Sequence, residues 1–277
     1  MKELIEYLRS RAETGLLDWN AQVEAAEKYS FTMARVEEMA LKEGILPVRY
    51  LRNGSTISRE QQFRLFQSSV AVVGCGGLGG YVIEELARLG VGRLTIIDYD
   101  FFEEHNLNRQ LFSSMENLGQ AKVSAAVKRV KKINPAVTVK IIEEKFDILK
   151  GLEMLSEAHV AADALDGISV RLELADVCDR LKIPLVHGAI AGWYGQVLTQ
   201  LPGEKSLETL YRKSVVDTGK EKELGNLPFT PAIVASLQAA EICKVLLNQG
   251  SLLSGRVLHI DLLEMEFEEV PLSSIFT

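Results

Sequence analysis

Three glycines, Gly74, Gly76 and Gly79, follow an apolar stretch at residues 69–73 in the spacing G-x-G-x-x-G. In this spacing the first glycine permits a tight turn, the second lets the backbone approach a phosphate, and the third lets a helix pack closely against a strand. A helix that begins at such a turn directs its free N–H groups at an anion. We therefore expect a strand at residues 69–73, a helix from about Tyr81, and a nucleotide-binding turn between them.

An acidic residue ends the next apolar stretch, which covers residues 93–98. This residue, Asp98, lies 19 positions beyond Gly79, and a carboxylate at the end of the second strand can accept hydrogen bonds from a ribose hydroxyl. The strand, the helix and the acid together predict a β-α-β nucleotide site. They do not decide which nucleotide binds.

Polar side chains that could hold phosphates follow the predicted strands. The segments that carry them are Asp98-Tyr99-Asp100, Asn106-Leu107-Asn108-Arg109-Gln110, Gly119-Gln120-Ala121-Lys122 and Ala164-Leu165-Asp166. Open α/β sheets bind ligands at the carboxyl ends of their strands, so these segments should meet there. Arg109 and Lys122 could neutralise phosphates, and Asp166 could hold Mg²⁺ between phosphate oxygens. A triphosphate needs such groups and a dinucleotide does not, so ATP fits better than NAD.

A mostly parallel sheet is needed to bring these segments together. Strand-like stretches at residues 69–73, 93–98, 137–142, 160–165 and 183–187 alternate with helical patterns, and this alternation indicates parallel strands covered by helices. Later stretches predict an antiparallel strand at 195–200, a helix at 230–247 and a strand pair at 257–263 and 266–272. The expected fold is α/β and Rossmann-like, with helices on both faces of the sheet and an antiparallel C-terminal extension.

We expect two units along the chain, an N-terminal helical arm at residues 1–45 and an ATP-binding domain at residues 46–277. The arm carries apolar stripes that 45 residues should not bury alone, which makes it a candidate for dimer contact. The plainer alternative is that the arm packs on its own subunit. Residues 201–230 are polar and contain Gly203, Gly219 and Gly225. They predict a long loop that either grips a partner or acts as a lid.

The composition limits the class of function. The formal net charge of −7 over 277 residues provides no basic surface for nucleic acid or an anionic membrane. The apolar runs look strand-length, shorter than a membrane span, and the first residues resemble no secretory signal, so we expect a cytoplasmic protein. The cysteines Cys75, Cys178 and Cys243 form no C-x-x-C pair, which argues against a disulfide framework and a zinc site.

The ordered motifs resemble those of the ThiF/MoeB/HesA superfamily, the bacterial relatives of ubiquitin-activating enzymes, over roughly residues 45–272. The matching segments are Arg49-Tyr50-Leu51-Arg52-Asn53, the glycines Gly74, Gly76, Gly77 and Gly79, the pair Asp98 and Asp100, the segments Asn106 to Gln110 and Gly119 to Lys122, and Asp166. The sequence departs from the family pattern at Gly167, where an Asn is common.

The resemblance implies adenylation of the C-terminal Gly-Gly carboxylate of a small ubiquitin-like sulfur carrier, with release of pyrophosphate, in molybdopterin, tungstopterin or thiamine biosynthesis. It implies that Asp98 holds the ribose, that Asp166 binds Mg²⁺, and that phosphates are held by Asn106, Arg109 and Lys122. The glycines, Asp100, Gln110 and Leu165 would complete the ATP site. Arg52 would reach the γ-phosphate of ATP in the other subunit, which implies a homodimer.

Two absences separate this sequence from other members of that superfamily. It lacks the two C-x-x-C pairs that hold zinc, so we expect no zinc, and residues 201–230 contain no cysteine. The reaction should therefore stop at the acyl-adenylate. Three other functions remain open: adenylation of a peptide, a small molecule or a tRNA base; a non-catalytic ATP-binding scaffold; and, last, an NAD dehydrogenase. The acidic composition argues against the tRNA base.

Overall fold

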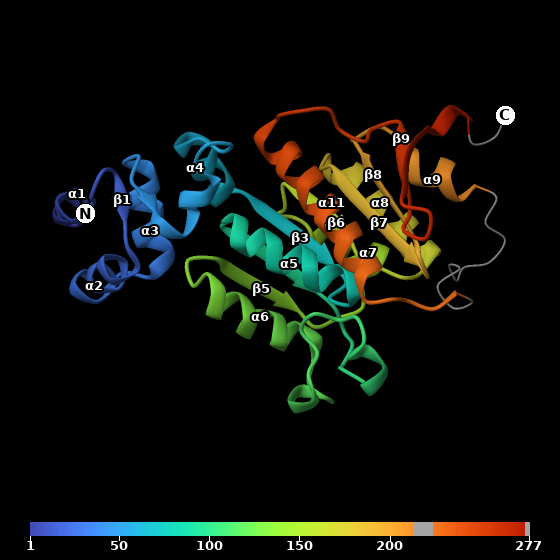
Figure 1. Ribbon diagram of the computed structural model, residues 1–277, viewed down its shortest axis with the longest axis horizontal. Coiled ribbons are helices and arrows are strands. Elements are labelled where there is room, and N and C mark those ends of the chain that lie inside the picture. Colours follow the sequence, from blue (N-terminus) through green and yellow to red (C-terminus); the bar gives the residue numbers. More distant parts are fainter. Residues whose placement is uncertain (213–223, 275–277) are drawn as a thin grey trace.

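The computed structural model describes residues 1–212 and 224–274. Its main sheet contains, in chain order, β3 (Ser69–Val73), β4 (Arg93–Ile97), β5 (Thr138–Ile142), β6 (Val160–Asp163), β7 (Leu185–Ala191), β8 (Tyr194–Gln200), β9 (Arg256–Asp261) and β10 (Glu266–Pro271). Across the sheet the order is β10-β9-β8-β7-β6-β3-β4-β5 (Figure 1). The strands from β5 to β7 are parallel, and β8, β9 and β10 add to them in antiparallel fashion. The predicted fold class is confirmed.

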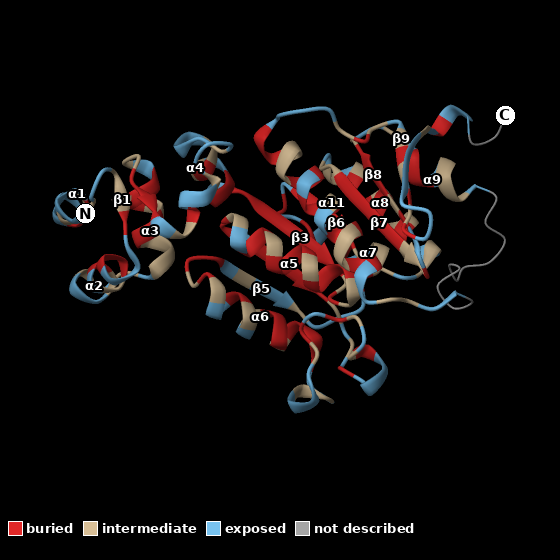
Figure 2. Ribbon diagram, viewed as in Figure 1, coloured by how far each residue is buried: buried red, intermediate tan, exposed pale blue. Residues whose placement is uncertain are grey.

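Two apolar clusters cover the two faces of the sheet. On β3, Val70 and Val72 face a cluster formed with α5 (Gly77–Leu89), α6 (Lys122–Ile133) and α11 (Phe229–Leu247). The alternate residues Ala71 and Val73 face a second cluster formed with α7 (Ile148–Met154), α8 (Ile168–Leu181) and α9 (Ser206–Tyr211). All five residues of β3 are buried (Figure 2), because β3 lies inside the sheet with helices on both sides.

Helix α5 begins at Gly77, four residues earlier than predicted from the sequence. Glycines are poor helix formers, so the sequence from Gly76 to Gly80 does not indicate that a helix begins there. The structure shows why the glycines are needed: a Cβ at position 79 would lie 1.9 Å from the Gly74 carbonyl oxygen. Close packing of the turn outweighs helix propensity at this position.

The C-terminal half of the chain differs from the sequence-based prediction in two places. Residues 206–211 of the predicted loop form α9, while residues 213–223 of that loop lie outside the described part of the chain. Helix α11 has 19 residues and is long and apolar enough to cross a membrane, so the expectation of strand-length apolar runs was wrong. It packs against α5 and the strands β6, β7 and β8, and 56% of its apolar window is buried there, as in a core helix of a globular domain.

The N-terminal arm buries its own apolar side chains. It contains α1 (Lys2–Arg11), α2 (Trp19–Tyr29) and α3 (Met33–Lys42), and a parallel pair of two-residue strands, β1 (Leu16–Leu17) and β2 (Leu46–Pro47). The three helices enclose a cluster of Leu4, Leu8, Leu17, Ala21, Ala25, Val36, Met39, Ala40 and Ile45. The expectation that the arm needs another subunit to bury its stripes was therefore wrong, because its three helices pack against one another. We propose to keep the boundary of this unit at residue 45.

A buried polar joint attaches the arm to the core of the same chain. Residues of the short helix η1 (Val48–Asn53) form it. The Tyr50 hydroxyl donates a hydrogen bond to Glu37 Oε1 at 2.6 Å and accepts one from Asn134 Nδ2 at 2.8 Å, and Arg49 Nη1 lies 3.3 Å from Glu37 Oε2. Burial raises the pKa of Glu37. The arm thus packs on its own subunit.

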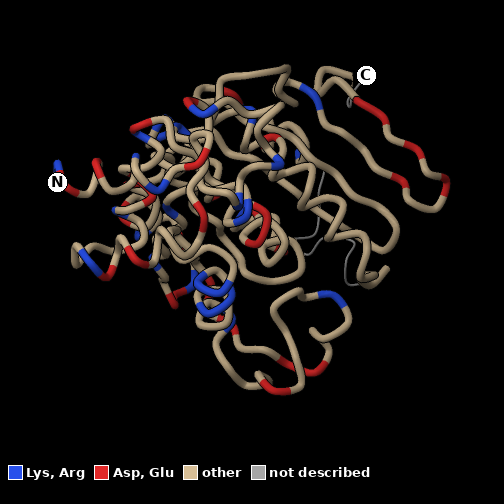
Figure 3. The backbone as a smooth tube through the Cα atoms, turned by 60° about the vertical axis from the view of Figure 1, so that its left-hand side comes forward, with Lys and Arg blue, Asp and Glu red and all other residues tan. Residues whose placement is uncertain are grey.

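Acidic and basic side chains alternate over most of the backbone, whereas the hairpin of β9 and β10 carries mainly acidic ones (Figure 3). Its exposed carboxylates include Glu264, Glu266, Glu268 and Glu269. Strand β10 is an edge of the sheet. Charges on an exposed edge strand disfavour pairing with another sheet.

Candidate active site

A pocket of about 530 Å³ opens at the carboxyl ends of β3, β4 and β6. Most of the residues predicted from the sequence line it, namely Gly74, Gly76, Gly77, Asp98, Asp100, Arg109, Gln110, Lys122, Leu165 and Asp166. The parallel strands explain this convergence, because residues that follow neighbouring strands meet at one edge of the sheet. The pocket has the size of an ordinary small-molecule site.

The glycine turn forms the floor of the pocket. The Gly74 N–H donates to the Ile97 carbonyl at 2.8 Å, and Gly74 has a φ of +99°. A Cβ there would lie 2.5 Å from the Ala164 carbonyl oxygen, so this position requires glycine. Gly76 is the N-cap of α5 and provides no side-chain cap for the first N–H groups. Such a helix N-terminus fits an anionic ligand, and phosphate is the obvious one.

Asp98 joins the glycine turn to the segment after β4. Its Oδ2 accepts a hydrogen bond from the Cys75 N–H at 2.6 Å, and its Oδ1 accepts one from the Asp100 N–H at 2.8 Å. Burial raises the pKa of Asp98, although these two hydrogen bonds oppose the rise. A carboxylate has about four lone-pair sites, so two remain for the hydroxyls of a ribose.

The two predicted cations, Lys122 and Arg109, both line the pocket but have different partners. Lys122 has a side chain only 7% exposed, and its Nζ lies 2.9 Å from Asp100 Oδ2. Arg109 Nη1 donates to the His105 carbonyl and to Asn108 Oδ1, both at 2.9 Å, and burial lowers the pKa of Arg109. Asp100 therefore acts here as the partner of Lys122. Both side chains line the pocket with donors suited to phosphate oxygens.

Asp166 is an exposed carboxylate on the turn between β6 and α8. Its side chain makes no hydrogen bond or ion pair with any other described residue. Among the described residues, no group of three or more His, Cys, Asp or Glu side chains could hold a metal ion without further ligands. Mg²⁺ is commonly bound by one or two carboxylates together with substrate phosphates, and a lone Asp166 fits that pattern.

Three predicted site residues do not line the pocket. Asn106 is 3% exposed, and its Oδ1 accepts from the Glu103 N–H at 3.0 Å at the start of the short helix η2 (Glu104–Asn106). Gly79 serves the close packing of α5 described above. Arg52 is exposed on η1, where the neighbouring Tyr50 ring lies against Gly90 at the far end of α5. A helix of this length separates that end from the pocket by roughly 20 Å.

Gln110 lies in the pocket wall with an unused acceptor. Its side chain is 7% exposed, and its Oε1 has no hydrogen-bond partner among the described residues. The nearest approach to the turn is at Gly76, where a Cβ would lie 3.6 Å from Gln110 Nε2. Buried amide oxygens are normally hydrogen-bonded, so this atom is a candidate contact for a bound ligand.

A buried polar cluster that adjoins the pocket, and whose Arg171 also lines it, was not predicted from the sequence. We call it the β6 polar cluster, and its members are Asp163, Arg171, His187, Gln196 and Tyr211. Asp163, Arg171 and His187 are at most 2% exposed, and Asp163 Oδ2 lies 2.7 Å from His187 Nδ1. These residues come from five elements and share no local spacing. The only sequence signal was a charged pair, Asp163 and Arg171, on either side of Asp166.

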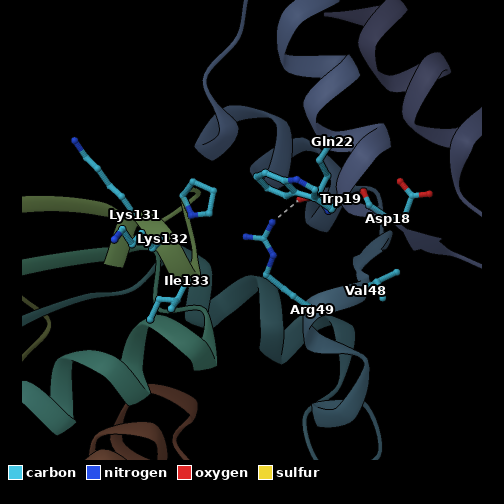
Figure 4. A pocket seen from close by; sticks show the side chains of 9 residues that line it. Asp18, Trp19, Gln22, Val48, Arg49, Lys131, Lys132 and Ile133 are labelled. Carbon is cyan, nitrogen blue, oxygen red and sulfur yellow. Dashed lines mark hydrogen bonds between the residues drawn. The ribbon is translucent and has the colours of Figure 1, made fainter. Parts of the chain in front are cut away.

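A second cavity, of about 350 Å³, lies between the arm and α6 (Figure 4). In it, Arg49 Nη2 donates to Gln22 Oε1 at 3.1 Å, and the Arg49 guanidinium lies 5.3 Å from the Trp19 ring centroid. Lys131 and Lys132 are at the rim. Because Arg49 is already paired with Glu37, this cavity belongs to the joint between arm and core.

The three cysteines are in unreactive surroundings. Cys75 and Cys178 are buried, and burial raises the pKa of each thiol well above its usual range. Cys243 on α11 is partly exposed, and burial raises its pKa as well. The thiolate is the nucleophilic form of cysteine, so none of the three is set up for covalent catalysis.

Comparison with known proteins identifies relatives over most of the chain. A family model described as the ThiF family matches residues 50–275. The SAMP-activating enzyme E1 of Haloferax volcanii is 39% identical over 220 residues, which cover 78% of this chain and 80% of that protein. The sulfur carrier protein adenylyltransferase of Thermus thermophilus is 36% identical over 222 residues, covering 77% and 82%. The molybdopterin-synthase adenylyltransferase of Haemophilus influenzae is 33% identical over 222 residues, covering 78% and 90%.

Solved structures with the same fold include MccB of Escherichia coli. Its complex with MccA-N7isoASN matches with a TM-score of 0.71 at 22% identity, covering 81% of this chain and 72% of that one. Its complex with ATP matches with a TM-score of 0.68 at 21% identity, covering 81% and 71%. These likenesses concern the fold. The family match and the curated relatives carry the assignment, and the chain belongs to the ThiF family.

Proposed function

We propose that this chain, an adenylyltransferase, uses ATP and Mg²⁺ to adenylate the C-terminal Gly-Gly carboxylate of a small ubiquitin-like sulfur-carrier protein. The products are an acyl-adenylate and pyrophosphate. The observation that carries the proposal is the convergence of a helix N-terminus, Arg109, Lys122 and Asp166 on one pocket. The names of the relatives support the reaction class and the kind of substrate.

The pocket residues suit attack of a carboxylate on the α-phosphorus of ATP. The reaction builds negative charge on the non-bridging oxygens of that phosphorus and on the departing pyrophosphate. The guanidinium of Arg109 and the ammonium of Lys122 would bind these oxygens, and the N–H groups at the start of α5 would add further donors. Asp98 would orient the nucleotide by its ribose. Asp166 would hold Mg²⁺, which neutralises phosphate charge and orients the leaving group when bound.

The proposed reaction stops at the acyl-adenylate. Attack by a protein thiol on the acyl-adenylate would form a thioester, but residues 201–230 contain no cysteine. Cys75, Cys178 and Cys243 lie in or near apolar cores, with raised pKa values caused by burial. Another protein would then deliver sulfur to the activated carrier. Molybdopterin, tungstopterin and thiamine biosynthesis are the pathways that we propose, and the free thiols fit a cytoplasmic location.

We also propose a homodimer in which Arg52 serves the partner's site. Arg52 lies at the far end of α5 from the pocket of its own chain, so it cannot contact ATP bound there. Exposed Val48 and Leu51 flank it on η1, and exposed Phe101, Leu111 and Met115 surround the loop after β4. A two-fold axis that brings these two apolar surfaces together would place Arg52 of each subunit near the other pocket.

Pyrophosphate exchange with purified Gly-Gly carrier proteins tests this function. Radiolabelled pyrophosphate should enter ATP only when a cognate carrier and Mg²⁺ are both present. A carrier that lacks its last glycine is the matched control and should give no exchange. Calorimetry gives a second test, because ATP with Mg²⁺ should bind more tightly than NAD. Tighter binding of NAD, or exchange without any carrier, would contradict the proposal.

A further inference from the structure

The Tyr211 hydroxyl contacts three other members of the β6 polar cluster, namely Arg171, His187 and Gln196. The Asp163 carboxylate accepts, so His187 Nδ1 carries a proton in their 2.7 Å contact, and in the neutral imidazole Nε2 is then the acceptor. The Tyr211 hydroxyl then donates to His187 Nε2 at 3.0 Å, and accepts from Arg171 Nη1 at 3.2 Å and from Gln196 Nε2 at 2.9 Å. The hydroxyl thus contacts three described members of the cluster at once.

Arg171 carries this arrangement to the turn that bears Asp166. Its Nε and Nη2 both donate to the Leu165 carbonyl, at 3.1 and 2.5 Å. On its other side Leu165 donates its N–H to Asp163 Oδ1 at 3.0 Å. The peptide between Leu165 and Asp166 is planar, so fixing its carbonyl also fixes the direction in which the backbone enters Asp166. The Asp166 side chain has no other described partner to hold it.

We propose that Tyr211 is a positioning residue of the active site, which acts through Arg171 to orient the Leu165–Asp166 turn. Tyr211 ends α9, a helix that contacts α8 and β8 on the opposite face of the sheet from α5. A shift of α9 would thereby change the orientation of the Asp166 carboxylate, which would hold Mg²⁺. This inference rests on the proposed function, in which Asp166 is the metal-binding group.

Binding of an inert ATP analogue to Tyr211→Phe tests the proposal. In the wild type, Mg²⁺ should increase the affinity for α,β-methylene ATP. The variant should lose up to roughly tenfold of that increase, the lower end of the loss seen when a group bonded directly to a metal ligand is removed, because Tyr211 acts through Arg171. Its affinity without Mg²⁺ should stay within about twofold of the wild type. Tyr7→Phe is the matched control, because Tyr7 donates to Glu24 in the arm at 2.7 Å, far from the pocket.

Hydrogen exchange gives a readout that needs neither ligand nor activity. The amide of Leu165, which bonds to Asp163, should exchange faster in ligand-free Tyr211→Phe than in the wild type or in Tyr7→Phe. Arg171→Lys keeps the charge but loses the two parallel donors, so it should show the same faster exchange and the same loss of the Mg²⁺ effect. In the double variant the two losses should not add, because both residues act on one turn.

The outcomes separate this inference from the proposed function. An unchanged Mg²⁺ effect together with unchanged exchange at Leu165 would overturn the role of Tyr211. Equal weakening of binding with and without Mg²⁺ would also overturn it, because that pattern indicates general disruption of the pocket. If Tyr211→Phe does not fold, Arg171→Lys decides by the same two measurements. Absence of carrier-dependent pyrophosphate exchange in the wild type would instead remove the proposed function, and the hydrogen-exchange result would still stand.

Discussion

Asp166 is the pocket residue whose substitution should separate chemistry from folding. It is exposed and makes no hydrogen bond with other described residues, so Asp166→Asn removes a charge without breaking an internal contact. We expect Mg²⁺-dependent pyrophosphate exchange to fall by at least about a hundredfold, the scale of losing one positioned electrostatic group. The thermal midpoint should stay within about 2 °C of the wild type. Substantial exchange by the folded variant would remove Asp166 from metal binding.

Substitution of the cysteines, in contrast to that of Asp166, should leave pyrophosphate exchange intact. Cys75 donates weakly to the Lys122 carbonyl at 3.7 Å, and Cys178 is buried in the second apolar cluster. Burial raises the pKa of both thiols. The triple variant Cys75→Ala, Cys178→Ala, Cys243→Ala should lose about 1 kcal/mol of stability per buried thiol, yet keep pyrophosphate exchange. Loss of exchange in a folded triple variant, restored by returning one thiol, would show that cysteine takes part in the reaction.

The sequence predicted which residues meet in the pocket where the chemistry of a phosphate site limits the choice of residue type. Three of the four predicted glycines, together with Asp98, Lys122 and Asp166, line the pocket, because a phosphate site needs close backbone approach, cations and a carboxylate at strand ends. Prediction missed the β6 polar cluster, whose members are distant in sequence and become neighbours only when five elements pack. It also assigned a phosphate-binding role to Asn106, whose side-chain oxygen accepts a hydrogen bond from the Glu103 N–H at the η2 turn.

At the scale of elements, an ion-pair network fastens α5 to α6. Glu84 on α5 accepts from Arg129 on α6 at 2.8 Å through each oxygen, and from Arg88 at 2.6 and 2.8 Å. Burial alone raises the pKa of Glu84, but the hydrogen bonds from Arg129 and Arg88 outweigh it, so the pKa lies below its ordinary value. The pair links the helix of the glycine turn to the helix that begins with Lys122.

The variant Glu84→Gln should therefore lower the free energy of unfolding by about 1–2 kcal/mol at pH 7. Because the folded pKa is the lower one, this stabilisation is fully present above the unfolded value of about 4.3 and is lost as the pH falls through the folded pKa. Urea unfolding of both proteins at pH 7 and at pH values below 4 measures it. Glu157→Gln, at an exposed position, is the control and should change stability by less than about 0.5 kcal/mol. A difference between wild type and Glu84→Gln that is independent of pH would contradict this account.

The elements themselves were predictable where hydrophobic periodicity is strong. Strands β3, β4 and β10 lie within a residue of their predicted ranges, and α11 begins one residue earlier than predicted. The start of α5 was missed because close packing of the turn requires glycine at position 79, in the first turn of the helix. Helix α9 was missed because six residues, Ser206 to Tyr211, are too few to show a helical period among polar neighbours.

At the scale of the whole molecule, the position of Arg52 makes the proposed active site a shared one. Arg52→Ala and Lys122→Ala should each be nearly inactive as homodimers. In a heterodimer of the two, one pocket combines the intact Lys122 of one chain with the intact Arg52 of the other. Random exchange of subunits should therefore restore about one quarter of wild-type pyrophosphate exchange. The activity should be followed before and after mixing, with subunit exchange checked by native mass spectrometry of tagged chains.

The mixing experiment has a clear contrary result. If the tagged chains exchange and no activity returns, Arg52 acts in its own chain or has no role in the reaction. Because the arm packs on its own subunit, the proposed dimer would have to form its contact through the core and η1. The sequence motif did not show that Arg49 and Tyr50 form the joint between arm and core, because their partners Glu37 and Asn134 belong to other elements.

The contact between Lys122 and Asp100 gives the ammonium group a counter-ion from within the protein. A phosphate that approaches Lys122 must replace a carboxylate held 2.9 Å from the ammonium group. In the proposed function, ATP would gain further contacts at the glycine turn and at Asp98, which line the same pocket, and a small anion such as inorganic phosphate or chloride cannot make all of these contacts at once. When pyrophosphate leaves, Asp100 is again the nearest counter-ion. If ATP binds as proposed, the pair would therefore favour a nucleotide over small anions and would give the ammonium group a partner again once pyrophosphate has left.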